Sequence, residues 1–140
     1  MYTIIYLYNV DLLDEYLEEL EKDTSLDEFT IKDVQMKLPG TKHKWAGRLI
    51  RAKANLNKLF RKRRRLISEG AVKVVSKSPV RISTPIAKKQ VAGLDAVIDI
   101  DDEIKDQETM IQFLEKAEKI FNSMTFDIRN LTEIMKLETQ

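Results

Sequence analysis

Cysteine is absent from this chain of 140 residues, and histidine occurs only once, at His43. The sequence therefore provides no thiol for a disulfide or a cysteine-based metal site, and no second histidine for a zinc shell or a histidine-based catalytic group. It also contains neither a GxxxxGKS/T nor a GxGxxG phosphate-binding loop. Its carboxylates are spread along the expected helices. These absences predict a protein that is not an enzyme and that holds no metal or cofactor.

Glycine and proline are scarce as well, with four and three residues, which leaves little room for many strands and turns. The length suits one ordinary domain, and the mix of 43% hydrophobic and 34% charged residues is typical of a helix-rich soluble protein. Residues 1–10 are apolar but lack a basic leader and a cleavage site, and they are too few to span a membrane. We expect a frayed end, a docked strand or an over-extended start there rather than a signal peptide.

The charges are segregated along the chain, although they nearly cancel at a net +1. Residues 1–33 carry a net −8, residues 34–94 a net +16 with Glu69 as their only acid, and residues 95–140 a net −7. Such a basic segment indicates a polyanionic partner, because each cation laid on a phosphate releases counterions. Nucleic acid is the favoured partner. One alternative is a basic face that pairs with the acidic ends of this or a neighbouring subunit. Another is an anionic membrane, although the basic residues are not opposed by the Trp/Phe-rich apolar face that membrane binding uses.

Hydrophobic periodicity and turn signals predict a mainly all-α chain of elongated helices. Residues 11–22 are expected as an acidic helix and residues 23–38 as a short helix or packed loop, with Pro39-Gly40 as a break. The later elements expected are a basic helix over about 41–68 that ends before Gly70, a loop or small β-hairpin over 70–83, and a short helix that Thr84-Pro85 opens and Gly93 interrupts. One long helix follows over about 95–138. We expect residues 1–94 and 95–140 to form one structural domain.

Two apolar stripes step by alternating spacings of four and three, as in a heptad repeat. The first, in the basic helix, has one charged member; it comprises Trp45, Leu49, Ala52, Leu56, Leu59, Arg63 and Leu66. The second, in the C-terminal helix, is wholly apolar; it comprises Met110, Leu114, Ala117, Phe121, Met124, Ile128, Leu131 and Met135. Further apolar residues widen this second stripe beyond a two-stranded seam, so we expect it to hold a homo-oligomer together. The alternative is a core within one chain.

Cations of the basic helix form the candidate nucleic-acid site. They share one face or follow one another around the helix, as a backbone-tracking stripe would; they are Lys44, Arg48, Arg51, Lys58, Arg61, Lys62, Arg63, Arg64 and Arg65. Trp45 could stack on a base, but its place in the apolar stripe favours core packing. His43 is expected as a flanking donor rather than a metal ligand. The chain shows no zinc-finger, homeodomain or RNP signature, so sequence-specific readout is not expected.

The chain resembles the UvsY-type recombination mediator family of T-even-like phages over roughly residues 13–138. The segment 17–23 resembles the acidic opening helix of that family, and Lys44-Trp45 is similar to its Ser-Lys-Trp/Tyr stretch. Arg63-Arg64-Arg65-Leu66 resembles its Lys-Ala-Arg-Leu single-strand-binding motif, with Arg64 in place of the alanine and Ile67-Ser68-Glu69 in place of the following tyrosine pair. Residues 110–115 and 120–130 are similar to its C-terminal helix.

This resemblance implies a non-hydrolysing mediator that binds single-stranded DNA together with a phage single-strand-binding protein and a RecA-like recombinase. Such proteins help to nucleate the recombinase filament on covered strands, and they form rings of six or seven subunits. The cytoplasm of the infected host cell is the expected location, which the absence of cysteine also suits. The alternatives are a generic basic coiled-coil nucleic-acid-binding or structural phage protein, and an adaptor that binds only protein.

Overall fold

Helices make up nearly all of the computed structural model, which describes the backbone of residues 2–140 and the side chains of residues 12–140. The four helices are α1 (Tyr2–Asp23), α2 (Ile31–Lys77), α3 (Thr84–Ala92) and α4 (Asp95–Glu138). No strand occurs among residues 2–140, so the all-α class is confirmed and the small hairpin expected over 70–83 is wrong. Residues 2–10 form the first turns of α1, so the docked strand among the alternatives expected for residues 1–10 is wrong; residue 1 lies outside the described residues.

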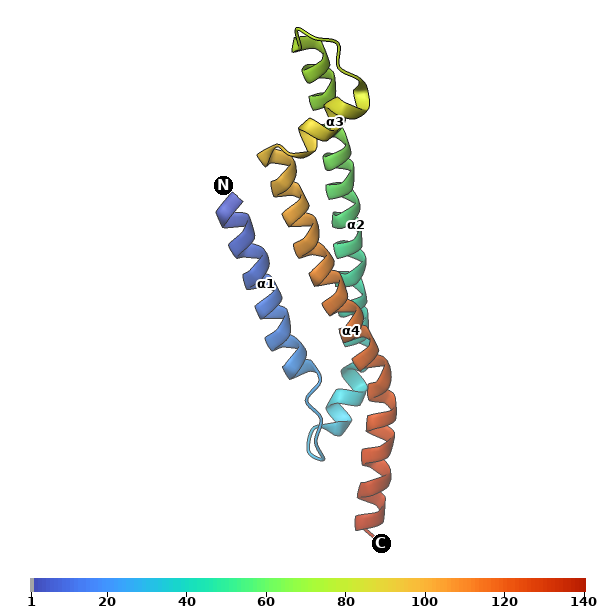
Figure 1. The fold of residues 1–140 in the computed structure, drawn as a ribbon. Coiled ribbons are helices and arrows are strands. Elements are labelled where there is room, and N and C mark those ends of the chain that lie inside the picture. Colours follow the sequence, from blue (N-terminus) through green and yellow to red (C-terminus); the bar gives the residue numbers. More distant parts are fainter. Residues whose placement is uncertain (1) are drawn as a thin grey trace.

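The long helices α2 and α4 lie side by side and run in opposite directions (Figure 1). Helix α1 lies along this pair and points the same way as α4, whereas α3 sits at the end where α2 finishes and α4 begins. The core forms where the three long helices meet, and its largest fully buried side chains include Trp45 of α2 together with Leu114 and Phe121 of α4. Leu12, Leu13, Tyr16 and Leu20 of α1 cover it only partly.

Helix α2 passes through Pro39, where the sequence predicted a break. A proline inside a helix removes one backbone hydrogen bond and costs about 3 kcal/mol. The neighbouring Leu38 is buried in the core, and Trp45 and Leu49 anchor the following turns. Packing of these apolar side chains against α4 therefore outweighs the local helix-breaking signal. The segment before α2 is a turn in which an Asp27 carboxylate oxygen accepts hydrogen bonds from the backbone N–H groups of Phe29 and Thr30.

Helix α2 also continues through Gly70 to Lys77, so the predicted end before that glycine and the loop over 70–77 are wrong. The glycine serves the packing of α3 instead. A Cβ placed on Gly70 would lie only 2.7 Å from Cγ1 of Val91, whose side chain is buried. The loop that does exist spans 78–83. The helix expected at Thr84-Pro85 is confirmed, with Ser83 as its N-cap and Gly93 as its C-cap.

Replacing Gly70 with alanine should destabilise the protein. Overlap of the new methyl group with Val91 costs about 1–3 kcal/mol in a packed site, whereas removing a helical glycine returns about 0.5–1 kcal/mol. The matched control is Gly40→Ala in the same helix, where a Cβ would meet nothing within 4 Å; it should stabilise by the second amount alone. Urea unfolding followed by circular dichroism measures both. A Gly70→Ala variant as stable as Gly40→Ala would show that α3 does not pack closely on α2.

Candidate nucleic-acid interface

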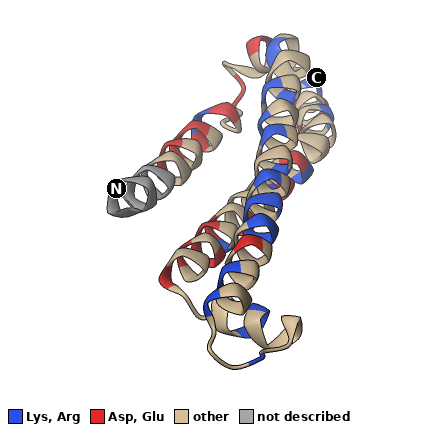
Figure 2. Ribbon diagram, turned by 90° about the horizontal axis from the view of Figure 1, so that it is seen from above, with Lys and Arg blue, Asp and Glu red and all other residues tan. Residues whose placement is uncertain are grey.

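Lysine and arginine residues follow α2 along its length, while acidic residues gather on α1 and at the start of α4 (Figure 2). At 100° per residue, five of the predicted cations fall within an arc of roughly 100° on the side of α2 that faces away from its buried stripe. This outer basic row consists of Arg51, Lys58, Arg61, Lys62 and Arg65, all of them exposed. None of these five forms an ion pair with any side chain from residue 12 onward. The row therefore offers available positive charge.

Arg64 is also exposed, but it lies on another flank of α2 from the outer basic row. There it lines a hollow of about 560 Å³ between α2 and α3, together with Phe60, Arg61 and Lys88. Phe60 is 40% exposed, and no carboxylate lines the hollow. An open aromatic ring among cations suits a nucleobase and its phosphate.

Arg63, in contrast, turns toward α4, where its Nε–H donates to Asp101. Its side chain is about one-third exposed. This placement agrees with its position in the apolar stripe of α2, because the aliphatic part of arginine can pack there while the guanidinium reaches the rim. Arg63 thus differs from Arg61 and Arg64 in having a carboxylate partner, although it lines the same hollow.

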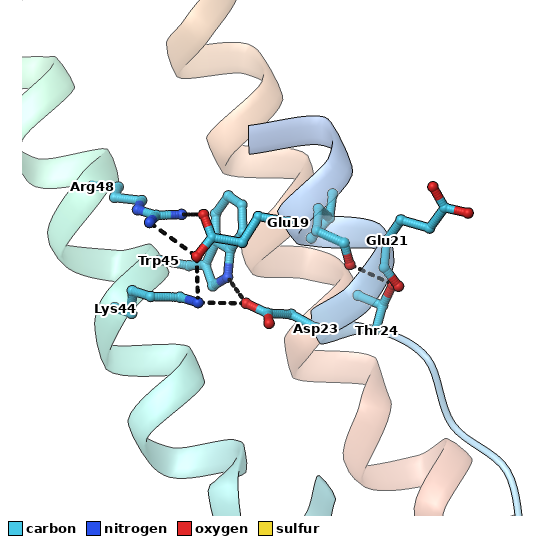
Figure 3. Close-up of polar contacts among 8 residues, drawn as sticks. Glu19, Glu21, Asp23, Thr24, Lys44, Trp45 and Arg48 are labelled. Carbon is cyan, nitrogen blue, oxygen red and sulfur yellow. Dashed lines mark hydrogen bonds and ion pairs between the residues drawn. The ribbon is translucent and has the colours of Figure 1, made fainter. Parts of the chain in front are cut away.

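Lys44 and Arg48 are paired with α1 (Figure 3). Lys44 Nζ lies 2.8 Å from a Glu19 oxygen and 2.6 Å from an Asp23 oxygen. Arg48 donates from both terminal nitrogens to the two oxygens of Glu19, at 2.6 and 3.2 Å. We call Glu19, Asp23, Lys44 and Arg48 the α1 ion-pair cluster. The acidic charge of residues 1–33 was a general signal for this cluster, but it did not identify these partners.

Trp45 lies beneath this cluster and is 1% exposed. Its indole N–H donates to Asp23 at 2.9 Å, and its ring contacts Tyr16, Phe113 and Phe121 at centroid distances of 5.8, 6.1 and 5.8 Å. The Arg48 guanidinium lies 4.3 Å from the Tyr16 ring and 4.7 Å from the Trp45 ring. The preference for core packing of Trp45 is confirmed. Its ring is closed to a base while α1 is in place.

The titration of the cluster follows from these contacts. The hydrogen bond from Arg48 lowers the pKa of Glu19 against the opposing effect of burial, with a further contribution from Lys44. Partial burial by itself would lower the pKa of Lys44, but the hydrogen bonds and charges of Asp23 and Glu19 together raise it. Both shifts favour the ionised forms of Glu19 and Lys44, which suits their ion pair.

A cavity of about 590 Å³ lies between α1, α2 and α4, beside the cluster. Leu12, Leu13 and Tyr16 of α1 line one wall, and Asp106 and Met110 of α4 line another. Burial, reinforced by the charge of Asp102, raises the pKa of Asp106. Helix α1 therefore covers the α2–α4 pair without filling the space beneath it.

The apolar stripe of α4 that was predicted to hold subunits together lies largely inside the single chain. Six of its members are core residues of the bundle, namely Met110, Leu114, Ala117, Phe121, Met124 and Ile128. Leu131 and Met135 are half-buried near the start of α2. Side chains so enclosed are not available to a second subunit, so any subunit contact needs another surface. Phe126, Ile134 and Leu137 offer exposed apolar surface on the same helix.

No helix within residues 2–140 is both long and apolar enough to cross a membrane. Among the side chains that the structure describes, no group of acidic residues and histidine could hold a metal ion. His43 is exposed on α2 next to the cluster.

The structure is thus an antiparallel pair of long helices with a basic outer side and an acidic covering helix. The family model described as "Recombination, repair and ssDNA binding protein UvsY" matches residues 19–139. The chain therefore belongs to the UvsY family of recombination and repair proteins. That match includes the outer basic row and the α1 ion-pair cluster.

Solved structures show the same fold. A crystal structure of the bacteriophage T4 recombination mediator protein UvsY, in lattice type IV, superposes with a TM-score of 0.75 at 17% identity, covering 90% of this chain and 98% of that one. A second, in lattice type II, gives 0.74 at 16% identity, covering 91% and 98%. No curated protein matches the chain in sequence.

Proposed function

We propose that the chain is a recombination mediator that binds single-stranded DNA along α2 without catalysing a reaction. The observation that carries this proposal is the outer basic row, five exposed cations on one side of one helix that have no acidic partner from residue 12 onward. Exposed cations in such a row neutralise successive phosphates and release their counterions. The family description, which includes single-strand binding, points to the same ligand.

The contacts with DNA are directed at the backbone. Lysine and arginine side chains of the row reach phosphates, which carry no sequence information. Phe60, in the hollow beside Arg61 and Arg64, adds an apolar surface for a base. Binding of this kind does not depend on base sequence. A mediator needs this property because it acts on any strand that the single-strand-binding protein covers. The strand held on α2 is then presented to a RecA-like recombinase, in the cytoplasm of the infected cell, while the single-strand-binding protein is held less firmly.

Several copies of the chain act together in this proposal, as a ring of six or seven subunits. One basic row makes a weak site, and linking copies raises the effective concentration of the others near a bound strand. Phe126, Ile134 and Leu137 are among the exposed apolar residues of α4 that are available for subunit contacts, because most of the apolar stripe lies in the core.

Salt dependence tests the DNA contact. If the five cations of the outer basic row each neutralise one phosphate, log affinity should fall with log salt at a slope of roughly −3.5 per protomer, at about −0.7 per contact. Fluorescence anisotropy of a labelled single strand, titrated at several salt concentrations, measures this slope. Binding that is absent at low salt, or that ignores salt, contradicts the proposal. If duplex DNA and RNA bound as tightly as single-stranded DNA, the protein would be a generic nucleic-acid binder. If none of the three bound, it would be an adaptor that binds only protein.

A further inference from the structure

The α1 ion-pair cluster covers two cations that continue the outer basic row. Counted around α2 at 100° per residue, Lys44 and Arg48 lie at the edge of the arc that contains Arg51, on the side facing α1. A strand that follows the row toward the start of α2 therefore reaches these two residues next. In the structure their charges are already matched by the Glu19 and Asp23 carboxylates.

Helix α1 is attached lightly for an element that covers so much charge. No side chain of α1 from Leu12 to Asp23 is fully buried, and the cavity of about 590 Å³ lies beneath its inner side. The carboxylate of Glu19 is 35% exposed and the ammonium side chain of Lys44 is 36% exposed. The Lys44–Glu19 pair, with this much access to water, contributes little to stability and is weakened by salt. The side chains of Asp23 and Arg48 are less exposed, at 22% and 18%. The turn over 24–30 joins α1 to α2 by a short connection that is mostly exposed, with Leu26 as its one residue packed against the core.

We propose that α1 is a built-in competitor for DNA, which occupies with Glu19 and Asp23 the places of two phosphates on Lys44 and Arg48. Binding of a strand displaces α1 from these cations and lengthens the DNA-binding face by two contacts. This inference rests on the proposed function of α2 as the strand-binding helix.

The chemistry of the exchange is balanced, because a carboxylate and a phosphate both accept the paired hydrogen bonds of a guanidinium. The strand can displace the carboxylates because it is already held nearby by the outer basic row. A strand held by Arg51 and the rest of the outer basic row brings its next phosphates to Arg48 and Lys44 at high effective concentration. The turn likewise holds the carboxylates of α1 at high effective concentration near Arg48 and Lys44. The strand and α1 therefore compete for the two cations with similar free energies. Displacement also removes Tyr16 and Asp23 from Trp45, which is the only tryptophan in the chain.

The double variant Glu19→Gln, Asp23→Asn tests this competition, because it keeps the shape of both side chains and removes their charge. A single-strand titration should show affinity raised by up to about 25-fold at 0.1 M salt, because the strand no longer has to displace carboxylates from two cations whose phosphate contacts are worth about fivefold each there. The matched control is Glu15→Gln, Glu18→Gln on the exposed side of α1, which changes the net charge equally and touches no ion pair described in the structure. An equal gain in the control would reduce the effect to bulk charge and overturn the inference.

Emission of Trp45 in the unaltered protein gives an independent readout. Single-stranded DNA should shift the emission maximum to longer wavelength, because release of α1 exposes the indole to water. DNA that binds with the expected salt slope but leaves the emission maximum unchanged would overturn the inference and leave the proposed function intact. Failure of the protein to bind DNA at all would overturn the proposed function itself. The two failures are therefore distinguishable even if the double variant does not fold.

Discussion

Replacing Phe121 with alanine should lower the free energy of unfolding by about 3–5 kcal/mol, as expected for truncation of a large buried aromatic side chain. Phe121 is 1% exposed, and its ring lies 5.8 Å from that of Trp45 at the point where α2 and α4 cross the core. The truncation leaves a cavity between two rigid helices that have few other elements to close it. A loss of this size is a large part of the stability of an ordinary domain.

The control is Phe126→Ala in the same helix, where the side chain is 64% exposed. Truncation there should change stability by no more than about 0.5 kcal/mol, as for most surface positions. Urea unfolding followed by Trp45 fluorescence and by circular dichroism compares the two. Similar losses for both variants would mean that Phe126 is also enclosed, which a subunit interface on that face would cause. A harmless Phe121→Ala would contradict the packing of α4 on Trp45.

Removal of Lys58, Arg61 and Arg65 together should weaken single-strand binding by about 100-fold at 0.1 M salt. Each phosphate contact contributes about fivefold at that concentration, and the salt slope should become shallower by about 2. All three side chains are exposed on one face of α2, so their replacement by alanine should leave helicity and stability unchanged. Arg63 is left in place because its guanidinium pairs with Asp101.

The matched control removes three exposed cations of α4, Lys116, Lys119 and Arg129, and so changes the net charge by the same amount. Its affinity should fall by only a small factor through the weakened overall field. Anisotropy titrations at several salt concentrations separate the two variants by slope as well as by affinity. Equal losses would show that binding follows net charge rather than the outer basic row.

Sequence patterns predicted α4 with the bounds that the structure shows, because every local signal there agrees. Gly93 ends the preceding helix, no proline or glycine follows, and the apolar residues repeat without interruption. Helix α2 was predicted too short because Pro39 and Gly70 are local signals for a break, while the forces that override them come from distant residues. The buried neighbours of Pro39 pack on α4, and Gly70 is needed for contact with Val91. Such partners cannot be known before the chain is folded.

The candidate site was predictable in its exposed part only. A run of cations in an amphipathic helix predicts an outer basic side whatever the fold, and the outer basic row lies there. Which carboxylates would meet Lys44 and Arg48 depends on the turn that lays α1 back along α2, and periodicity contains no information about that turn. The apolar stripe of α4 shows the same limit, because burial within a chain and burial between chains require the same residues. The structure encloses its first six members within one chain.

Under the proposed function, the uninterrupted course of α2 also favours a single strand over a duplex by shape. From Lys44 to Arg65 the helix rises by about 30 Å in a single stiff rod, at 1.5 Å per residue. Over nearly that length, about 34–36 Å, each strand of a DNA duplex winds once around its axis. A duplex laid beside the rod would therefore carry its phosphates away from most of the charges and bring them back only at the far end. A single strand, free to straighten, can keep every phosphate in line.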